Sequence, residues 1–95
     1  MKSVSVIVPA FNEELTIIEL LERVRAQRVD GFEFEVIVID DGSRDRTPDL
    51  LRDNAGLYDR LVNQSPNQGK GAAVIAGLCE ASGEYVLFQD ADLEY

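Results

Sequence analysis

The sequence has one cysteine, few basic residues and no apolar run close to the roughly 20 residues of a membrane span. The lone Cys79 excludes an intramolecular disulfide and a thiolate metal cluster, and its alanine-rich surroundings suggest a small core residue. Nine basic against 18 acidic residues give a formal net charge of −9, which argues against a nucleic-acid surface and against attraction to an anionic membrane. A phosphate ligand is not excluded. Because residues 1–3 lead straight into an apolar segment and not into a secretory signal, we expect an intracellular, cytoplasmic protein.

The length of 95 residues suffices for one domain with a core. It is smaller than nearly all nucleotide-dependent enzymes that bind two substrates. The chain shows no repeat, linker or low-complexity stretch. We therefore expect a single domain over residues 1–95 that is truncated relative to a complete enzyme.

Apolar runs alternate with amphipathic segments along the chain. The runs at 4–8, 36–39 and 85–88 predict buried strands, and a weaker run within 57–62 predicts a fourth. The segments between them carry apolar residues at helical spacing. This alternation with short connections predicts an α/β fold, with a parallel sheet in the order 3-2-1-4 and helices on both faces.

Single residues predict where several of these elements begin and end. Pro9 is expected to end the first strand, since proline cannot donate into a sheet ladder. Asn12 is expected to cap the first helix, and Thr47 and Pro48 fit the N-cap and N1 positions of the second. Gly83 is placed to terminate the third helix.

Four polar loops are predicted to converge at one edge of the sheet. In such folds, ligands bind outside the carboxyl ends of the strands, near the point where the strand order reverses. The loops span residues 9–13, 40–43, 67–71 and 90–92. Convergence of four loops is much harder to obtain by chance than any one of them, so this edge is the candidate site.

Asp90 and Asp92 are two carboxylates two residues apart, directly after a buried strand. Mg²⁺ and Mn²⁺ prefer anionic oxygen ligands and accept substrate phosphates beside them. A metal site that also holds a phosphate is therefore the first hypothesis. The alternative is a solvated turn in which the two acids cap backbone groups.

Other side chains in these loops allow two interpretations each. Phe11 can support a base or sugar, or pack under the first helix, and Glu13 can accept from a nucleotide or favour a positive helix N-terminus. Asp41 can accept from the N–H of a base, whereas Asp40 can hold the turn through local amides. Lys70 can meet a phosphate at a helix N-terminus or be a solvated residue.

Two common phosphate-binding patterns do not fit. The loop after the first strand lacks the glycines of a dinucleotide fingerprint. Lys70 is followed by Gly71 and not by the serine or threonine of a Walker loop. A different kind of phosphate or nucleotide site is therefore expected.

Taken together, the polar loops resemble the donor half of a family 2 glycosyltransferase. The resemblance covers the whole chain and is carried by the segments 6–14 (VIVPAFNEE), 38–43 (VIDDGS), 67–72 (NQGKGA) and 90–93 (DADL). The last segment is most similar to the polyprenyl-phosphate (dolichyl-phosphate) mannosyl- and glucosyltransferases. The resemblance implies a GT-A fold, which is a Rossmann-like sheet that binds a nucleotide-sugar and a divalent cation, Mg²⁺ or Mn²⁺.

The resemblance also implies roles for single positions. Residues after the first strand border the nucleotide, those at the end of the second contact the base, and those after the fourth face the ribose and diphosphate. The candidate donor-binding residues are Pro9, Phe11, Glu13, Ile39, Asp41, Lys70, Asp90 and Ala91. Asp90 and Asp92 are the candidate metal ligands, and no catalytic residue is identified within the chain.

Members of the family continue past the Asp-x-Asp into a part that binds the acceptor, so the resemblance implies half a site. In the full-length parent we expect inverting transfer of a hexose from a UDP- or GDP-linked sugar, with the cation neutralising the departing diphosphate. A polyprenyl phosphate acceptor needs no general base, because it is already anionic, and it would place the parent at the cytoplasmic membrane face. The alternative acceptor is a sugar hydroxyl.

The chain by itself allows an interpretation of another class, a non-enzymatic nucleotide-binding fragment. Truncation is also expected to leave the last strand at an uncovered edge. Such an apolar edge invites pairing with another copy, so we expect self-association.

Overall fold

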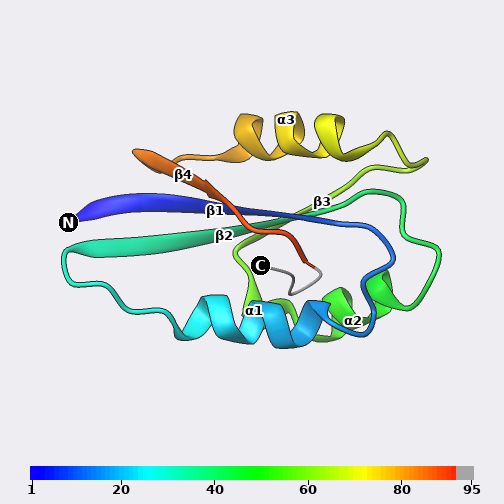
Figure 1. Cartoon of the computed structure of the whole chain (residues 1–95), viewed down its shortest axis with the longest axis horizontal. Coiled ribbons are helices and arrows are strands. Elements are labelled where there is room, and N and C mark those ends of the chain that lie inside the picture. Colours follow the sequence, from blue (N-terminus) through cyan, green and yellow to red (C-terminus); the bar gives the residue numbers. More distant parts are fainter. Residues whose placement is uncertain (92–95) are drawn as a thin grey trace.

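The computed structural model of this protein describes residues 1–91 (Figure 1). Its strands are β1 (Lys2–Ala10), β2 (Phe32–Asp40), β3 (Arg60–Asn63) and β4 (Tyr85–Phe88). Its helices are α1 (Ile17–Ala26), α2 (Thr47–Asp53) and α3 (Lys70–Glu80), with the short 3₁₀ turn η1 (Ala55–Leu57). Across the described residues, every helix is too short or too polar to cross a bilayer.

The four strands form one parallel sheet in the order β3-β2-β1-β4, which confirms the predicted topology. Helices α1 and α2 cover one face, and α3 covers the other (Figure 1). The two long central strands pair along their whole length, from Lys2 opposite Phe32 to Ala10 opposite Asp40. The carboxyl ends of β1 and β2 are therefore held side by side.

Alternate residues of the central strands pack into two separate cores. On the α1 face, Val6 and Val8 of β1 pack with Leu21 of α1. On the other face, Ile7 packs with Ala73 of α3. Helix α3 lies close to the sheet because its facing residues are small: a Cβ added to Gly77 would lie 2.5 Å from the Ile7 side chain.

Pro9 does not end β1, contrary to the prediction, because its missing N–H faces a part of the sheet that needs no donor. The carbonyl of Ile7 accepts from the Gln89 amide at 2.9 Å, so the polar groups of Ile7 point toward β4. Those of Pro9, two residues further on, point the same way. Since β4 ends at Phe88, opposite Ile7, proline costs no ladder bond here.

Helix starts were also predicted wrongly at two positions. Helix α1 begins at Ile17, while Asn12 has a φ of 53° and accepts from the Arg44 amide at 2.8 Å. Thr47 lies inside α2, and its hydroxyl accepts from the Glu13 amide at 2.9 Å. Both side chains join neighbouring loops and do not cap their own helices.

Two expectations about α3 were wrong for packing reasons. Helix α3 ends at Glu80, and Gly83 instead donates its amide to the Ser5 hydroxyl at 2.9 Å. A Cβ on Gly83 would lie 2.7 Å from the Ser5 nitrogen, so the glycine permits close approach to β1. Cys79 is exposed, because α3 meets the sheet through Ala73 and Gly77.

Glu35 of β2 joins three elements at the end of the sheet away from the polar loops. Its carboxylate accepts from the Ser5 hydroxyl at 2.7 Å and from the Ser82 amide and hydroxyl at 3.1 and 3.0 Å. It also pairs with Arg60 at 3.3 Å. Burial raises the pKa of Glu35, but the hydrogen bonds from these three residues outweigh it and hold that pKa below its usual value.

Replacing Glu35 with glutamine should lower the free energy of unfolding by about 1–3 kcal/mol at neutral pH, since it weakens hydrogen bonds to a charged acceptor. Because the folded-state pKa is depressed, the contribution is full above the unfolded pKa and is lost as pH falls through the folded pKa. Urea unfolding measured from neutral pH into the acid range should show that the difference in free energy of unfolding between the unchanged chain and Glu35→Gln shrinks as the pH falls. Glu33→Gln, an exposed change on the same strand, is the control. A difference independent of pH would contradict this assignment.

Candidate functional site

A pocket of about 320 Å³ lies at the carboxyl ends of the strands. Its walls come from the ends of β1 and β2, the start of α3 and the segment after β4. It is lined by Pro9, Ala10, Phe11, Glu13, Asp41, Asn67, Gly69, Lys70, Ala73, Asp90 and Ala91. The structure thus brings the predicted donor-binding residues together at one edge, with one exception.

The exception is Ile39, which is fully buried in the core on the α3 face and does not line the pocket. Its neighbour Asp41 does line it, because the strand ends between them at Asp40. Asp92, the second predicted metal ligand, lies outside the described residues.

Backbone amides of the loop after β1 donate to side chains of the loop after β2. The Asn12 amide donates to the Ser43 hydroxyl at 2.9 Å, and the Glu14 amide donates to the Asp45 carboxylate at 3.2 Å. Asp45 also accepts from the Thr47 amide at 2.8 Å. Burial raises the pKa of Asp45, but the hydrogen bonds from Thr47 and Glu14 outweigh it and lower that pKa. These contacts hold two walls of the pocket together.

Asp41 joins the loop after β2 to the loop before α3. Its carboxylate, in a residue only 4% exposed, accepts from the Gln68 amide at 2.7 Å and from the Gly69 amide at 2.9 Å. The side-chain amide of Asn67 donates to the same carboxylate at 3.0 Å. Since a carboxylate offers about four acceptor positions, these three donors leave Oδ1 with room for one more. Asp41 is therefore an organiser of the loop as well as a candidate base contact.

The tight fit of these loops depends on a glycine. Gly42 has a φ of 69°, and a Cβ added to it would lie 2.6 Å from the Asn67 nitrogen. Asp40, two residues before Gly42, accepts from the Ser43 amide at 3.2 Å, which confirms its predicted role in the turn. The turn after β2 is thus set by backbone geometry.

The segment after β4 is held from both sides. The Thr16 hydroxyl donates to the Ala91 carbonyl at 2.6 Å, which ties this segment to the start of α1. On the other side, the Lys70 ammonium forms an ion pair with the Asp90 carboxylate. Thr16 carries no signal in the sequence that would mark it as part of the site, because its partner is a backbone group 75 residues away.

Asp90 has the chemistry of a ligand for a divalent cation. Among residues 1–91, no cluster of three or more metal-ligating side chains is found. Asp90 is, however, a carboxylate of which 53% is exposed, and the ammonium seated on it shows that it presents its oxygens to a cation at the pocket. A hard anionic oxygen of this kind suits Mg²⁺ or Mn²⁺.

Further pocket residues escaped the sequence analysis. Asn67 and Gly69 belong to the polar segment 67–71, but their individual roles depend on contacts with Asp41. Ala73 lines the pocket as a small side chain within α3, and nothing in the sequence distinguishes it from a core alanine.

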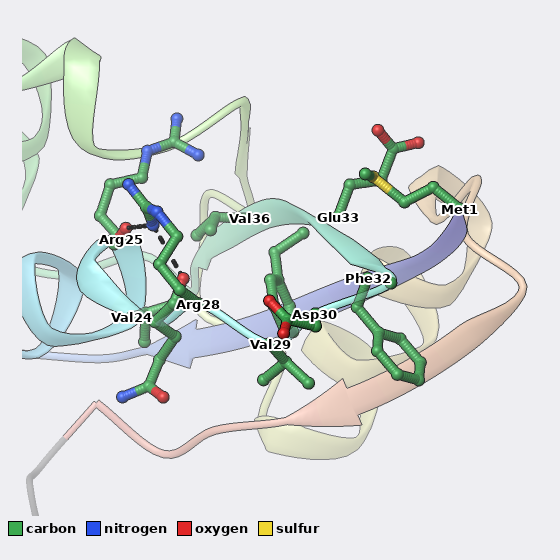
Figure 2. Close-up of a pocket in the computed structure, with 12 residues that line it drawn as sticks. Met1, Val24, Arg25, Arg28, Val29, Asp30, Phe32, Glu33 and Val36 are labelled. Carbon is green, nitrogen blue, oxygen red and sulfur yellow. Dashed lines mark hydrogen bonds between the residues drawn. The ribbon is translucent and has the colours of Figure 1, made fainter.

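A second hollow, of about 430 Å³, lies at the opposite end of the sheet, where β2 begins (Figure 2). Val29 and Phe32 contribute apolar walls. The Arg28 guanidinium is turned back onto the end of α1, where it donates to the carbonyls of Arg25 and Gln27 at 2.7 and 2.8 Å. Ligands of parallel α/β sheets bind at the carboxyl ends of the strands, so the smaller pocket remains the candidate site.

The parallel sheet with helices on both faces and a polar pocket at its carboxyl edge defines a Rossmann-like domain of the nucleotide-binding class. Residues 5–95 match the family "Glycosyl transferase family 2". The chain belongs to this family, which confirms the resemblance found in the sequence.

The chain is 42% identical over 97 residues to dolichyl-phosphate beta-glucosyltransferase ALG5D of Trichomonas vaginalis, a match that covers 94% of this chain and 30% of the relative. It therefore spans about a third of the length of such relatives.

Solved glycosyltransferase structures confirm the GT-A fold. S. aureus TarS 1–349 in complex with UDP has a TM-score of 0.83 and 38% identity, with 97% of this chain and 28% of that one covered. The mannosyltransferase PcManGT of Pyrobaculum calidifontis, in complex with GDP-Man and Mn²⁺, has a TM-score of 0.79 and 36% identity, with 94% and 27% covered. These neighbours bind a nucleotide or nucleotide-sugar, and one of them holds a divalent cation.

Asp41→Asn should loosen the loop at 67–69, because it places an NH₂ group where a carboxylate oxygen accepts from backbone amides. The free energy of unfolding is expected to fall by about 1–3 kcal/mol. Hydrogen exchange followed by NMR should quicken at the amides of Gln68 and Gly69. Asp49→Asn, which changes an exposed carboxylate on α2, should leave those amides unchanged. Unchanged hydrogen exchange at the Gln68 and Gly69 amides in Asp41→Asn would contradict the role of Asp41 in organising this loop.

Proposed function

We propose that the full-length protein transfers a hexose from a nucleotide-sugar to a polyprenyl phosphate, and that residues 1–95 hold the donor. The observation that carries this proposal is the pocket formed by four loops at the carboxyl ends of β1, β2 and β4 and at the start of α3. Membership of the family supports the chemistry. The relative named for transfer to dolichyl phosphate supports the acceptor.

The pocket supplies a different kind of contact to each part of a nucleoside diphosphate. Phe11, which is 42% exposed, offers an apolar ring, and Asp41 offers an acceptor at the buried end. Lys70 and the first amides of α3 suit the diphosphate, because a helix N-terminus favours an anion. Glu13 lies on the same wall as Phe11 and suits a sugar hydroxyl.

Asp90 and Asp92 are the proposed ligands of Mg²⁺ or Mn²⁺. When bound, the cation would neutralise the charge that develops on the departing diphosphate. The Mn²⁺ found with GDP-Man in the mannosyltransferase structure supports a divalent cation. Thr16 would keep the segment between the two carboxylates in place through its bond to the Ala91 carbonyl.

A polyprenyl phosphate acceptor needs no general base. A phosphate monoester is already anionic near neutral pH, so its oxygen attacks without losing a proton. The acceptor's lipid tail would place the full-length protein at the cytoplasmic membrane face. Transfer of labelled hexose to dolichyl phosphate by the full-length protein supports this acceptor, and transfer only to a saccharide contradicts it.

Nucleotide should strengthen Mn²⁺ binding by the chain. Two carboxylates leave most of the octahedral positions to water, and a diphosphate fills some of them. We expect UDP or GDP to lower the Mn²⁺ dissociation constant about five-fold or more, with a reciprocal effect of Mn²⁺ on the nucleotide. Calorimetry with and without nucleotide measures both.

Asp92→Asn should abolish this coupling and leave thermal unfolding unchanged, while Asp49→Asn should alter neither. If Asp92→Asn folds and the coupling persists, the cation lies elsewhere. If the variant unfolds, Asp92 is a structural cap, and the metal site is wrong.

The outer edge of β4 is a proposed pairing surface for a second copy of the chain. Within the described residues, β4 pairs only with β1, and its residues Tyr85–Phe88 carry no charge or proline to block further pairing. Leu87 and Phe88 are each 54% exposed. An apolar, unguarded edge of this kind favours association.

Sedimentation velocity at rising concentration should therefore show a dimer or larger species. Leu87→Lys should restore the monomer, because a lysine on an edge strand opposes pairing. Ile75→Lys, at an exposed position on α3, is the control for a general gain of charge. A monomer at every concentration, or equal disruption by both variants, would rule out pairing through this edge.

A further inference from the structure

Lys70 and Asp90 form an ion pair between two of the walls of the nucleotide pocket. Lys70 is the first residue of α3, and Asp90 follows β4. Their side chains are 66% and 53% exposed, so the pair faces the solvent and any ligand. The same two residues are those proposed to meet the diphosphate and the cation.

The position of Lys70 explains why it needs an anion. The N-terminus of a helix carries partial positive charge, so an ammonium group at this end of α3 is electrostatically unfavourable by itself. The carboxylate of Asp90 offsets both charges. A diphosphate at the same helix end would offset them equally well.

Asp90 cannot serve Lys70 and a divalent cation in the same way at the same time. An ammonium and a metal ion on one carboxylate would repel each other at close range. The exposed ion pair is weak, because solvent-exposed pairs contribute only a few-fold to an equilibrium constant. A divalent ion with twice the charge can therefore displace the ammonium.

Lys70 forms an ion pair with Asp90, whereas Asp41 is held by backbone amides. Asp41 accepts from the amides of Gln68 and Gly69, which commits it to the loop before α3. Asp90 is thus the carboxylate that links Lys70 to the proposed cation.

We propose that Lys70 is the counter-ion of Asp90 in the absence of ligands. When a divalent cation binds, the Lys70 ammonium leaves Asp90 and pairs with the donor diphosphate. This inference rests on the proposed function. It gives a physical route for part of the coupling between metal and nucleotide: the diphosphate draws Lys70 away and frees Asp90 for the cation. Lys70 is a positioning residue in this scheme, because it acts on the metal through Asp90.

The test measures Mn²⁺ binding to the whole chain without nucleotide, by the loss of the electron paramagnetic resonance signal of free Mn²⁺. Lys70→Met should bind Mn²⁺ about two- to five-fold more tightly than the unchanged chain, because the competing ammonium is gone. Lys70→Arg keeps a positive partner for Asp90 and should stay close to the unchanged chain. With UDP or GDP present, the gain in Mn²⁺ affinity should be smaller in Lys70→Met than in the unchanged chain.

Two controls separate this exchange from a general effect of charge. Arg44→Met removes a positive charge from a neighbouring loop that does not line this pocket, and it should change Mn²⁺ affinity less than Lys70→Met. In an Asp90→Asn background, Lys70→Met should not change Mn²⁺ affinity, since the carboxylate for which Lys70 and Mn²⁺ compete is absent. Thermal unfolding of each variant checks that the fold is retained.

The outcomes distinguish this inference from the proposed function. If nucleotide strengthens Mn²⁺ binding but Lys70→Met does not alter binding of Mn²⁺ alone, the exchange is wrong and the function stands. If Lys70→Met tightens Mn²⁺ binding through Asp90 but nucleotide has no effect, the function is wrong and the competition stands. Equal tightening in the Asp90→Asn background, or no Mn²⁺ binding in any variant, overturns the exchange.

Discussion

The buried carboxylate of Asp41 is the interaction on which the pocket depends. A charge this deeply buried is costly unless it is hydrogen-bonded, and three N–H donors from residues 67–69 meet it. To supply them, the chain turns back over β2, with Gly69 at a φ of 93°. That turn sets where α3 begins, and therefore where Lys70 stands opposite Asp90. The Asp41 carboxylate, just after β2, thus fixes one wall of the pocket and the position of Lys70.

Two of the acidic residues that line the pocket, Asp41 and Asp90, have different tasks. Asp41 is 4% exposed and is hydrogen-bonded by the loop before α3, whereas the Asp90 side chain is 53% exposed and forms a weak surface ion pair with Lys70. A pocket built in this way keeps its shape before a ligand arrives, because the loops are held by bonds that the ligand does not replace. Preorganisation lowers the ordering cost of binding. The contacts that must change are confined to the exposed residues.

Much of the architecture follows from the pattern of the sequence, while single polar residues were harder to interpret. Alternating apolar and amphipathic segments predicted the strands, the helices and the strand order 3-2-1-4. Asn12 and Thr47 have the right chemistry for helix caps but bond to the neighbouring loop, because tertiary contact offered them backbone amides that needed acceptors. Pro9 continues its strand because β4 ends before its level. In each case the local propensity was correct and a distant partner decided the outcome.

The sequence by itself determined the fold class, the family and the edge of the sheet where polar residues gather, because hydrophobic periodicity and motif order are written in neighbouring residues. Only the tertiary structure decided which of those residues share a pocket. It buried Ile39 in the α3 core, committed Asp41 to the loop before α3 and placed Lys70 on Asp90, 20 residues further along the chain. Such pairings depend on the register of parallel strands and on the close packing of α3 against β1. Neither leaves a local trace in the sequence.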